Sequence, residues 1–89
     1  MNAKRRNAIE SVINELIERF EEIKAEAIDQ LSEIRDEEQE AYDNLPEALL
    51  DSEKGENMQN CIYALEYFMS DLENMEIEGI NDLYEEVGL

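Results

Sequence analysis

The sequence predicts an all-α fold, a long antiparallel helical hairpin of the coiled-coil type. Apolar residues recur every three or four positions through most of the 89 residues, the period of helices that bury one face. Helix breakers are confined to a few places, since Pro46 is the only proline and no glycine precedes Gly55. We therefore expect a single domain over residues 1–89, with one long helix on each side of a short connection.

The first helix is predicted from about residue 4 to residue 42. At about 1.5 Å per residue it would be roughly 58 Å long. Its main apolar residues form a heptad-like strip with one extra residue after Ala27: Ile9, Ile13, Leu16, Phe20, Ile23, Ala27, Leu31 and Ile34. Val12, Ile17 and Ile28 widen this strip beyond two positions in seven, which favours a helical bundle.

The connection is predicted at residues 43–52. Pro46 disfavours the helical conformation for Leu45, so the first helix should end before it. Residues 46–50 have the pattern of one helical turn with the proline at its first position. Ser52 is expected to cap the second helix. Three leucines are expected to cover the end of the hairpin: Leu45, Leu49 and Leu50.

The second helix is predicted from about residue 53 to residue 86, with Gly88 ending it. Gly79 costs about 1 kcal/mol inside a helix, so it marks a kink, a close crossing or the start of a separate short helix. We favour a continuous helix that is weakened there. Cys61 is expected to be a small buried apolar residue. The apolar strip continues through these positions: Met58, Cys61, Leu65, Phe68, Leu72, Met75, Gly79, Leu83 and Val87.

Both predicted helices have an apolar face wider than one partner helix covers. Two helices of similar length with a short connection pack antiparallel. The hairpin is therefore expected to form a homodimer, most simply a four-helix bundle with two-fold symmetry. Periodicity alone does not separate the positions that face the partner helix from those that face a second copy.

The charge is strongly acidic, with 25 acids against 7 bases and a formal net charge of −18. No base follows Lys54. Such a surface repels nucleic acid and anionic membranes and attracts basic proteins, for example a nuclease or regulator that binds nucleic acid. The candidate contact residues are acids near the connection and in the second helix: Glu37, Glu38, Glu40, Asp43, Glu73, Glu76, Glu78, Asp82, Glu85 and Glu86.

The density of this charge suggests a function. Along helices about 55 Å long, −18 corresponds to about one charge per 3 Å, near the ~3.4 Å of a single nucleic-acid strand. A dimer would approach the ~1.7 Å of duplex DNA. One hypothesis is therefore an inhibitor that mimics DNA on a basic partner surface. The alternative is a structural or adaptor coiled coil, in which Tyr63 and Tyr67 are candidate interface aromatics.

Residues for catalysis are missing from the sequence. It contains no histidine, so no serine or cysteine has the usual general base, and no Glu-x-x-His pair, calcium loop or phosphate loop occurs. We expect no enzymatic activity, cofactor or metal. Cys61 is the only cysteine, and a free thiol fits a reducing compartment. No apolar run approaches the ~20 residues of a membrane span, so a cytoplasmic location is expected.

Four stretches carry a resemblance to a known group: residues 1–6, 37–42, 43–47 (Asp-Asn-Leu-Pro-Glu) and 51–56. The chain resembles small acidic helical-hairpin proteins of bacteriophages and Gram-positive bacteria over about residues 1–70. It departs from them after Met69. The resemblance implies a phage or mobile element in a bacterial host, and no binding residues follow from it. In that setting a DNA mimic would be an inhibitor of the anti-defence or anti-CRISPR type.

Overall fold

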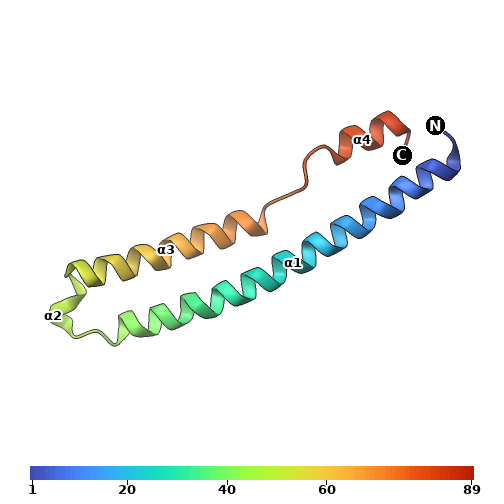
Figure 1. Ribbon diagram of the computed structural model, residues 1–89. Helices are drawn as coiled ribbons and strands as arrows, with labels where there is room; N and C mark the ends of the chain where they lie inside the picture. The colour runs from blue at the N-terminus through green and yellow to red at the C-terminus, as the bar shows by residue number, and fades with distance from the viewer. The chain divides into compact units, whose positions relative to one another are not determined.

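A computed structural model describes every residue from Met1 to Leu89. The chain is 83% helical and has no strand, which confirms the predicted all-α class. Figure 1 shows its four helices, α1 (Ala3–Asp43), α2 (Glu47–Leu50), α3 (Glu53–Glu73) and α4 (Ile80–Val87). The chain divides into two compact units, unit 1 (Met1–Ile23 with Met75–Leu89) and unit 2 (Lys24–Asn74). The single domain over residues 1–89 remains a prediction. No helix is both long enough and apolar enough to cross a membrane.

In unit 2, the second half of α1 and α3 run side by side in opposite directions, with α2 at the turn between them (Figure 1). Ile62 of α3 is the most deeply buried hydrophobic residue, with 2% of its surface exposed. Residues at helical spacing from it are half-buried or buried and mark the side of α3 that faces α1: Gly55, Met58, Leu65, Met69 and Leu72.

The side of α1 that faces α3 differs from the predicted strip. Ile34 is 52% exposed, whereas its neighbour Arg35 is half-buried and Lys24 is buried with 6% exposed. A helix with 3.6 residues per turn drifts away from a repeat of 3.5, so the predicted strip does not remain on one side of it. Lys24 and Arg35 have long aliphatic stems that can pack in such an interface while their charged ends reach its edge.

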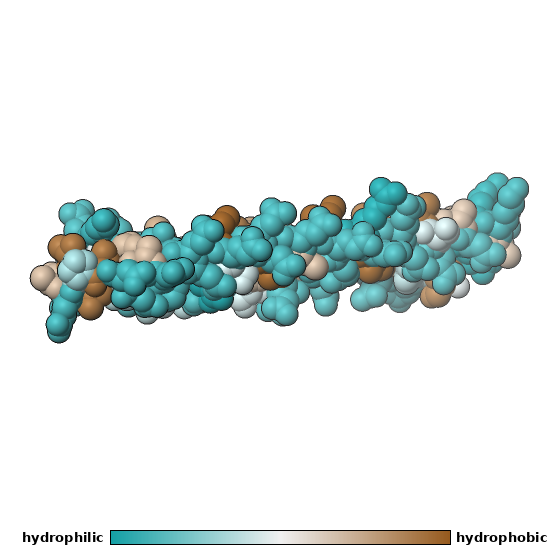
Figure 2. All heavy atoms as spheres, turned by 90° about the horizontal axis from the view of Figure 1, so that it is seen from below, coloured by the Kyte–Doolittle hydropathy of each residue, from teal (hydrophilic) through white to brown (hydrophobic).

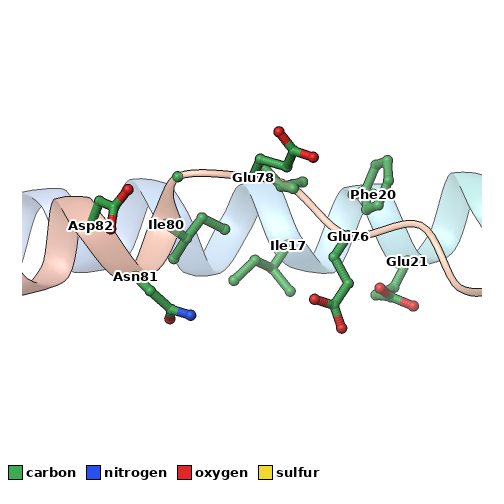
Figure 3. A pocket seen from close by; sticks show the side chains of 10 residues that line it. Ile17, Phe20, Glu21, Glu76, Glu78, Ile80, Asn81 and Asp82 are labelled. Carbon is green, nitrogen blue, oxygen red and sulfur yellow. The ribbon is translucent and has the colours of Figure 1, made fainter.

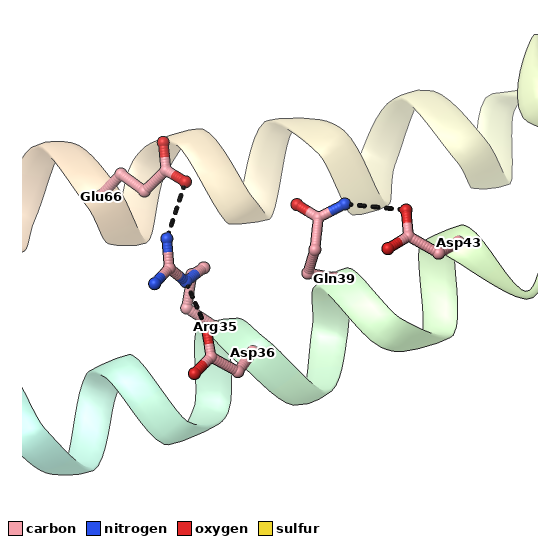
Figure 4. Close-up of polar contacts among 5 residues, drawn as sticks. All are labelled: Arg35, Asp36, Gln39, Asp43 and Glu66. Atoms are coloured by element: carbon pink, nitrogen blue, oxygen red, sulfur yellow. Dashed lines mark hydrogen bonds and ion pairs between the residues drawn. The ribbon is translucent and has the colours of Figure 1, made fainter.

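Arg35 forms ion pairs at that edge. Its Nη1 lies 3.1 Å from Oε1 of Glu66 on α3, and its Nε lies 2.9 Å from Oδ1 of Asp36 (Figure 4). The hydrogen bond to Glu66 and then the charge of Asp36 raise the pKa of Arg35 above its usual value. A raised pKa of a basic group stabilises the fold at every pH below its unfolded value. The Arg35 contribution is therefore present throughout the neutral range and is lost only in strong alkali.

Lys24 binds the C-terminal end of α3. Its Nζ donates a hydrogen bond of 3.1 Å to the backbone oxygen of Glu73, the last residue of that helix. The last carbonyls of a helix lack partners within the helix, and its dipole favours a cation there. Asn74 follows, and its Nδ2 donates to the Ser70 carbonyl at 3.0 Å, as its backbone N–H does at 3.1 Å.

Replacing Lys24 with methionine should lower the free energy of unfolding by about 1 kcal/mol. Methionine retains most of the aliphatic stem and removes the charge and the donor to Glu73. Lys54→Met is the matched control, because Lys54 is exposed and lies in the first turn of α3. The measurement is the urea midpoint by circular dichroism at one protein concentration. Equal midpoints for the two variants would contradict the capping role of Lys24.

The connection is built much as the sequence predicts. Pro46 directly precedes α2, and Ser52 caps α3 by accepting a 3.3 Å hydrogen bond from the Gly55 N–H. Leu45 and Leu50 are half-buried, whereas Leu49 is 40% exposed. Figure 2 shows hydrophobic side chains gathered at the α2 end of this unit, beside an otherwise largely hydrophilic surface.

The prediction of a continuous helix over residues 53–86 is wrong. α3 ends at Glu73, α4 begins at Ile80, and the residues between them are not helical. Gly79 has a φ of 86°, a left-handed conformation that glycine adopts without steric cost and that cannot continue a right-handed helix. The short separate C-terminal helix, the alternative raised by the sequence, is the correct one. Gly88 ends it as predicted, with a φ of 80°.

In unit 1, α4 lies along the first half of α1 (Figure 1). Each helix contributes half-buried apolar residues at helical spacing: Ile80, Tyr84 and Val87 from α4, and Ile9, Ile13 and Phe20 from α1. A Cβ at Gly88 would lie 3.6 Å from Nη1 of Arg6, so this guanidinium sits beside the C-terminal end of α4. The dipole of α4 favours a cation at that position.

Candidate functional site

A pocket of about 540 Å³ opens in unit 1 between α1 and the segment that leads into α4. Its floor is apolar, with Ile17 and Phe20 from α1 and Ile80 from the start of α4. Four carboxylates surround this floor: Glu21, Glu76, Glu78 and Asp82. Figure 3 shows Ile17 and Ile80 toward the middle of the pocket and the carboxylates around them. No basic residue lines it.

The break between α3 and α4 places Glu76 and Glu78 on the lining of one pocket. In a continuous helix, Glu76 and Glu78 would point about 200° apart and so to opposite sides. The non-helical residues 74–79 instead place both of them on the same pocket. Asp82 lies in the first turn of α4, where the helix dipole favours an acid. The left-handed conformation of Gly79 therefore helps to form this pocket, because it keeps residues 74–79 from continuing α3 as a helix.

The lining suits a cation with an aliphatic stem. The isoleucines can cover methylene groups, and the carboxylates can accept hydrogen bonds from an ammonium or guanidinium group. Lysine and arginine side chains combine these two parts. Nowhere in the structure do three or more Cys, Asp or Glu side chains form a group that could hold a metal ion.

The structure divides the ten predicted contact acids equally between the two units. Glu76, Glu78 and Asp82 share the pocket, whereas Glu85 and Glu86 are exposed on α4 outside it. The other five acids lie in unit 2 and form no common site: Glu37, Glu38, Glu40, Asp43 and Glu73.

The unit 2 acids have separate surroundings. Glu37 and Glu40 are exposed on α1, and Oδ1 of Asp43 accepts a 3.0 Å hydrogen bond from Nε2 of Gln39 (Figure 4). Glu38 is half-buried and lines a shallow hollow with Lys54, Met58 and Cys61, among others. Cys61 is exposed, so the expectation that it is buried is wrong.

The two candidate interface tyrosines lie on the surface of α3. Tyr63 is 51% and Tyr67 is 75% exposed, and they flank Glu66 in a shallow depression that Ser70 completes. This depression is on the side of the unit where Arg35 meets Glu66. Both side chains are thus available to a partner.

The sequence missed part of the pocket. Glu21 and Asn81 line it and were not among the candidates. Glu21 lies 55 residues before Glu76 in a helix with many other acids, so no local signal distinguishes it. Comparisons of the chain with protein-family models, with curated proteins and with solved structures find no match.

Proposed function

We propose that the chain is a non-enzymatic acidic binding module that docks on a basic surface of a partner protein. The observation that supports this function is the unit 1 pocket, where Glu76, Glu78 and Asp82 surround an apolar floor and no base is present. A lysine or arginine side chain of the partner would enter it. The remaining acids would contribute long-range attraction and speed the encounter.

The density of negative charge extends this proposal to mimicry of nucleic acid. A formal charge of −18 on 89 residues suits a surface that normally holds a phosphate backbone. The partner would then be a nuclease or regulator whose nucleic-acid site the chain occupies. An inhibitor of a bacterial defence system, such as an anti-CRISPR protein, is the specific form that we propose.

The test neutralises the pocket and compares it with an equal change elsewhere. Glu76→Gln, Glu78→Gln and Asp82→Asn together remove three negative charges. The matched control removes three from exposed acids outside the pocket: Glu73→Gln, Glu85→Gln and Glu86→Gln. Binding of an oligoarginine peptide should weaken about tenfold or more in the pocket variant relative to the control, since hydrogen bonds to charged groups contribute ~1.5–3 kcal/mol each.

The readout is fluorescence anisotropy of the labelled peptide at low and high salt. Equal loss in the two variants would show that charge alone acts, which would remove the pocket from the proposal. Retention of basic nucleic-acid enzymes from a bacterial lysate on the immobilised protein at low salt, with release at high salt, would support mimicry. If the pocket variant retained these enzymes as well as the wild type does, mimicry through the pocket would be contradicted.

A second candidate function is a structural or adaptor coiled coil that works by self-association. The observation that favours it is the small core, because Ile62, with 2% of its surface exposed, is the only buried hydrophobic residue. A chain of this size needs more buried apolar surface to offset the entropy of folding. We propose that two hairpins pair as a four-helix bundle, and that exposed Tyr63 and Tyr67 are the contacts for further partners.

A further inference from the structure

A regular apolar strip runs along one edge of the side of α3 that faces α1, and it shares half-buried Met58, Leu65 and Leu72 with that side. Successive residues of this strip are separated alternately by three and four positions. Viewed down the helix axis, the strip is centred about 80° from buried Ile62. Leu65 and Leu72 are half-buried, while Phe68 is 53% exposed and Cys61 is exposed. The strip contains no charged residue: Met58, Cys61, Leu65, Phe68 and Leu72. This spacing is that of a coiled-coil seam, and Cys61 and Phe68 are its exposed members.

α1 carries a matching strip in the same unit. Viewed down the axis of α1, Ile34 is rotated by about 80° from buried Lys24. The α3 strip is rotated from Ile62 in the same sense about the axis of α3. Because the two helices run in opposite directions, the same rotational sense places both strips on one side of the pair. The α1 strip is small or apolar with two polar members: Ala27, Gln30, Ile34, Glu38 and Ala41.

Contacts in unit 2 place the two strips on one face. Glu38 of α1 and Cys61 of α3 line the same hollow, and each belongs to one of the strips. The ion pair between Arg35 and Glu66 lies on the opposite side, next to the depression lined by Tyr63, Glu66 and Tyr67. Phe68 and Tyr67 are therefore adjacent in sequence but belong to opposite faces of the unit. We call the face with both strips the Phe68 face.

The total surface area is large for the mass of the chain. The chain exposes 7030 Å² at a mass of 10.4 kDa, whereas a compact monomer of this mass exposes about 5,400 Å². The excess is roughly 1,600 Å². Obligate homodimers bury about 1,000–2,500 Å² per chain. An interface of that class would remove the excess.

We propose that the Phe68 face pairs with the Phe68 face of a second copy and closes a four-helix bundle. This rests on the self-association proposed above and adds the surface that mediates it. A second copy presents two antiparallel helices with identical strips, so that the heptad positions interdigitate. Glu38 lies on the Phe68 face, and the acids of the other faces remain outside the interface.

The test introduces one charge on each of the two opposite faces. Phe68→Glu should weaken the dimer at least about 30-fold, since a central interface aromatic is a hot spot and a buried carboxylate has no partner there. Tyr67→Glu is the matched control, one residue away with 75% of its surface exposed. Sedimentation equilibrium over a range of concentrations gives both dissociation constants, and circular dichroism reports the helicity of each variant.

Salt and the native thiol supply measurements on the unmodified protein. Added salt should tighten the dimer, because it screens repulsion between two chains of −18, whereas it should weaken binding of a basic partner. Cys61 belongs to the α3 strip, so its alkylation by iodoacetamide should slow as the protein concentration rises. The salt dependence and the alkylation rate are measured on the wild-type protein, so they test the proposal even if Phe68→Glu does not fold.

The outcomes separate this proposal from those it rests on. A wild-type dimer that Phe68→Glu dissociates and Tyr67→Glu leaves intact, with a protected thiol, supports it. A dimer that both variants retain, or that only Tyr67→Glu weakens, overturns the Phe68 face and leaves self-association standing. A wild-type monomer at all concentrations overturns both. None of these results bears on the acidic pocket of unit 1, which the oligoarginine experiment tests.

Discussion

Replacing Ile62 with alanine is expected to lower the free energy of unfolding by about 2–5 kcal/mol. Ile62 is the one hydrophobic side chain that is almost wholly buried, at 2% exposure, and it lies on the side of α3 that faces α1. Removing its outer carbons forfeits the transfer free energy and leaves a cavity between the two helices. Ile62→Val should cost about 0.5–1.5 kcal/mol, which gives a graded series.

The neighbouring residue supplies the control for Ile62. Tyr63 is 51% exposed, and its replacement by alanine changes helix propensity by an amount similar to that of Ile62→Ala. Urea unfolding followed by circular dichroism, at one fixed protein concentration because a dimer would make stability depend on concentration, compares the two. If Tyr63→Ala cost as much as Ile62→Ala, the packing of α3 against α1 would differ from this structure.

Gly55→Ala is expected to destabilise the protein by about 1–3 kcal/mol, although alanine is the better helix former. A Cβ at this position would lie 2.7 Å from the carbonyl oxygen of Leu49 and closer still to that of Leu50. Both atoms are backbone, so they cannot move without shifting α2. Helix propensity alone predicts the opposite sign, a gain of about 1 kcal/mol.

The change in sign makes Gly55 a sharp test of the connection. Asn57→Ala is the control, because Asn57 is exposed in α3 and its replacement should raise stability by a few tenths of a kcal/mol through propensity. The urea midpoint should fall for Gly55→Ala and rise slightly for Asn57→Ala. A rise in both would show that α2 does not pack against the start of α3 as closely as described.

Only some of the residues of the acidic pocket could be predicted from the sequence. Glu76, Glu78 and Asp82 were candidates because acids without neighbouring bases fill the second half of the chain. Their convergence depends on the conformation of residues 74–79, and a single glycine in a sequence does not reveal whether its φ is positive. Glu21 joins them from a distant position on α1, which periodicity cannot indicate.

The sequence by itself determined the all-α class, the extent of α1 and the cap at Ser52, because these depend on local periodicity and turn chemistry. Only the tertiary structure decided which residues face which neighbour. On each helix of unit 2, more than one line of residues satisfies helical spacing. The pairing of α1 with α3 buries Lys24 and Ile62 and leaves Ile34 and Phe68 exposed. Non-local packing makes that selection, since a helix has the same local energy whichever strip is covered.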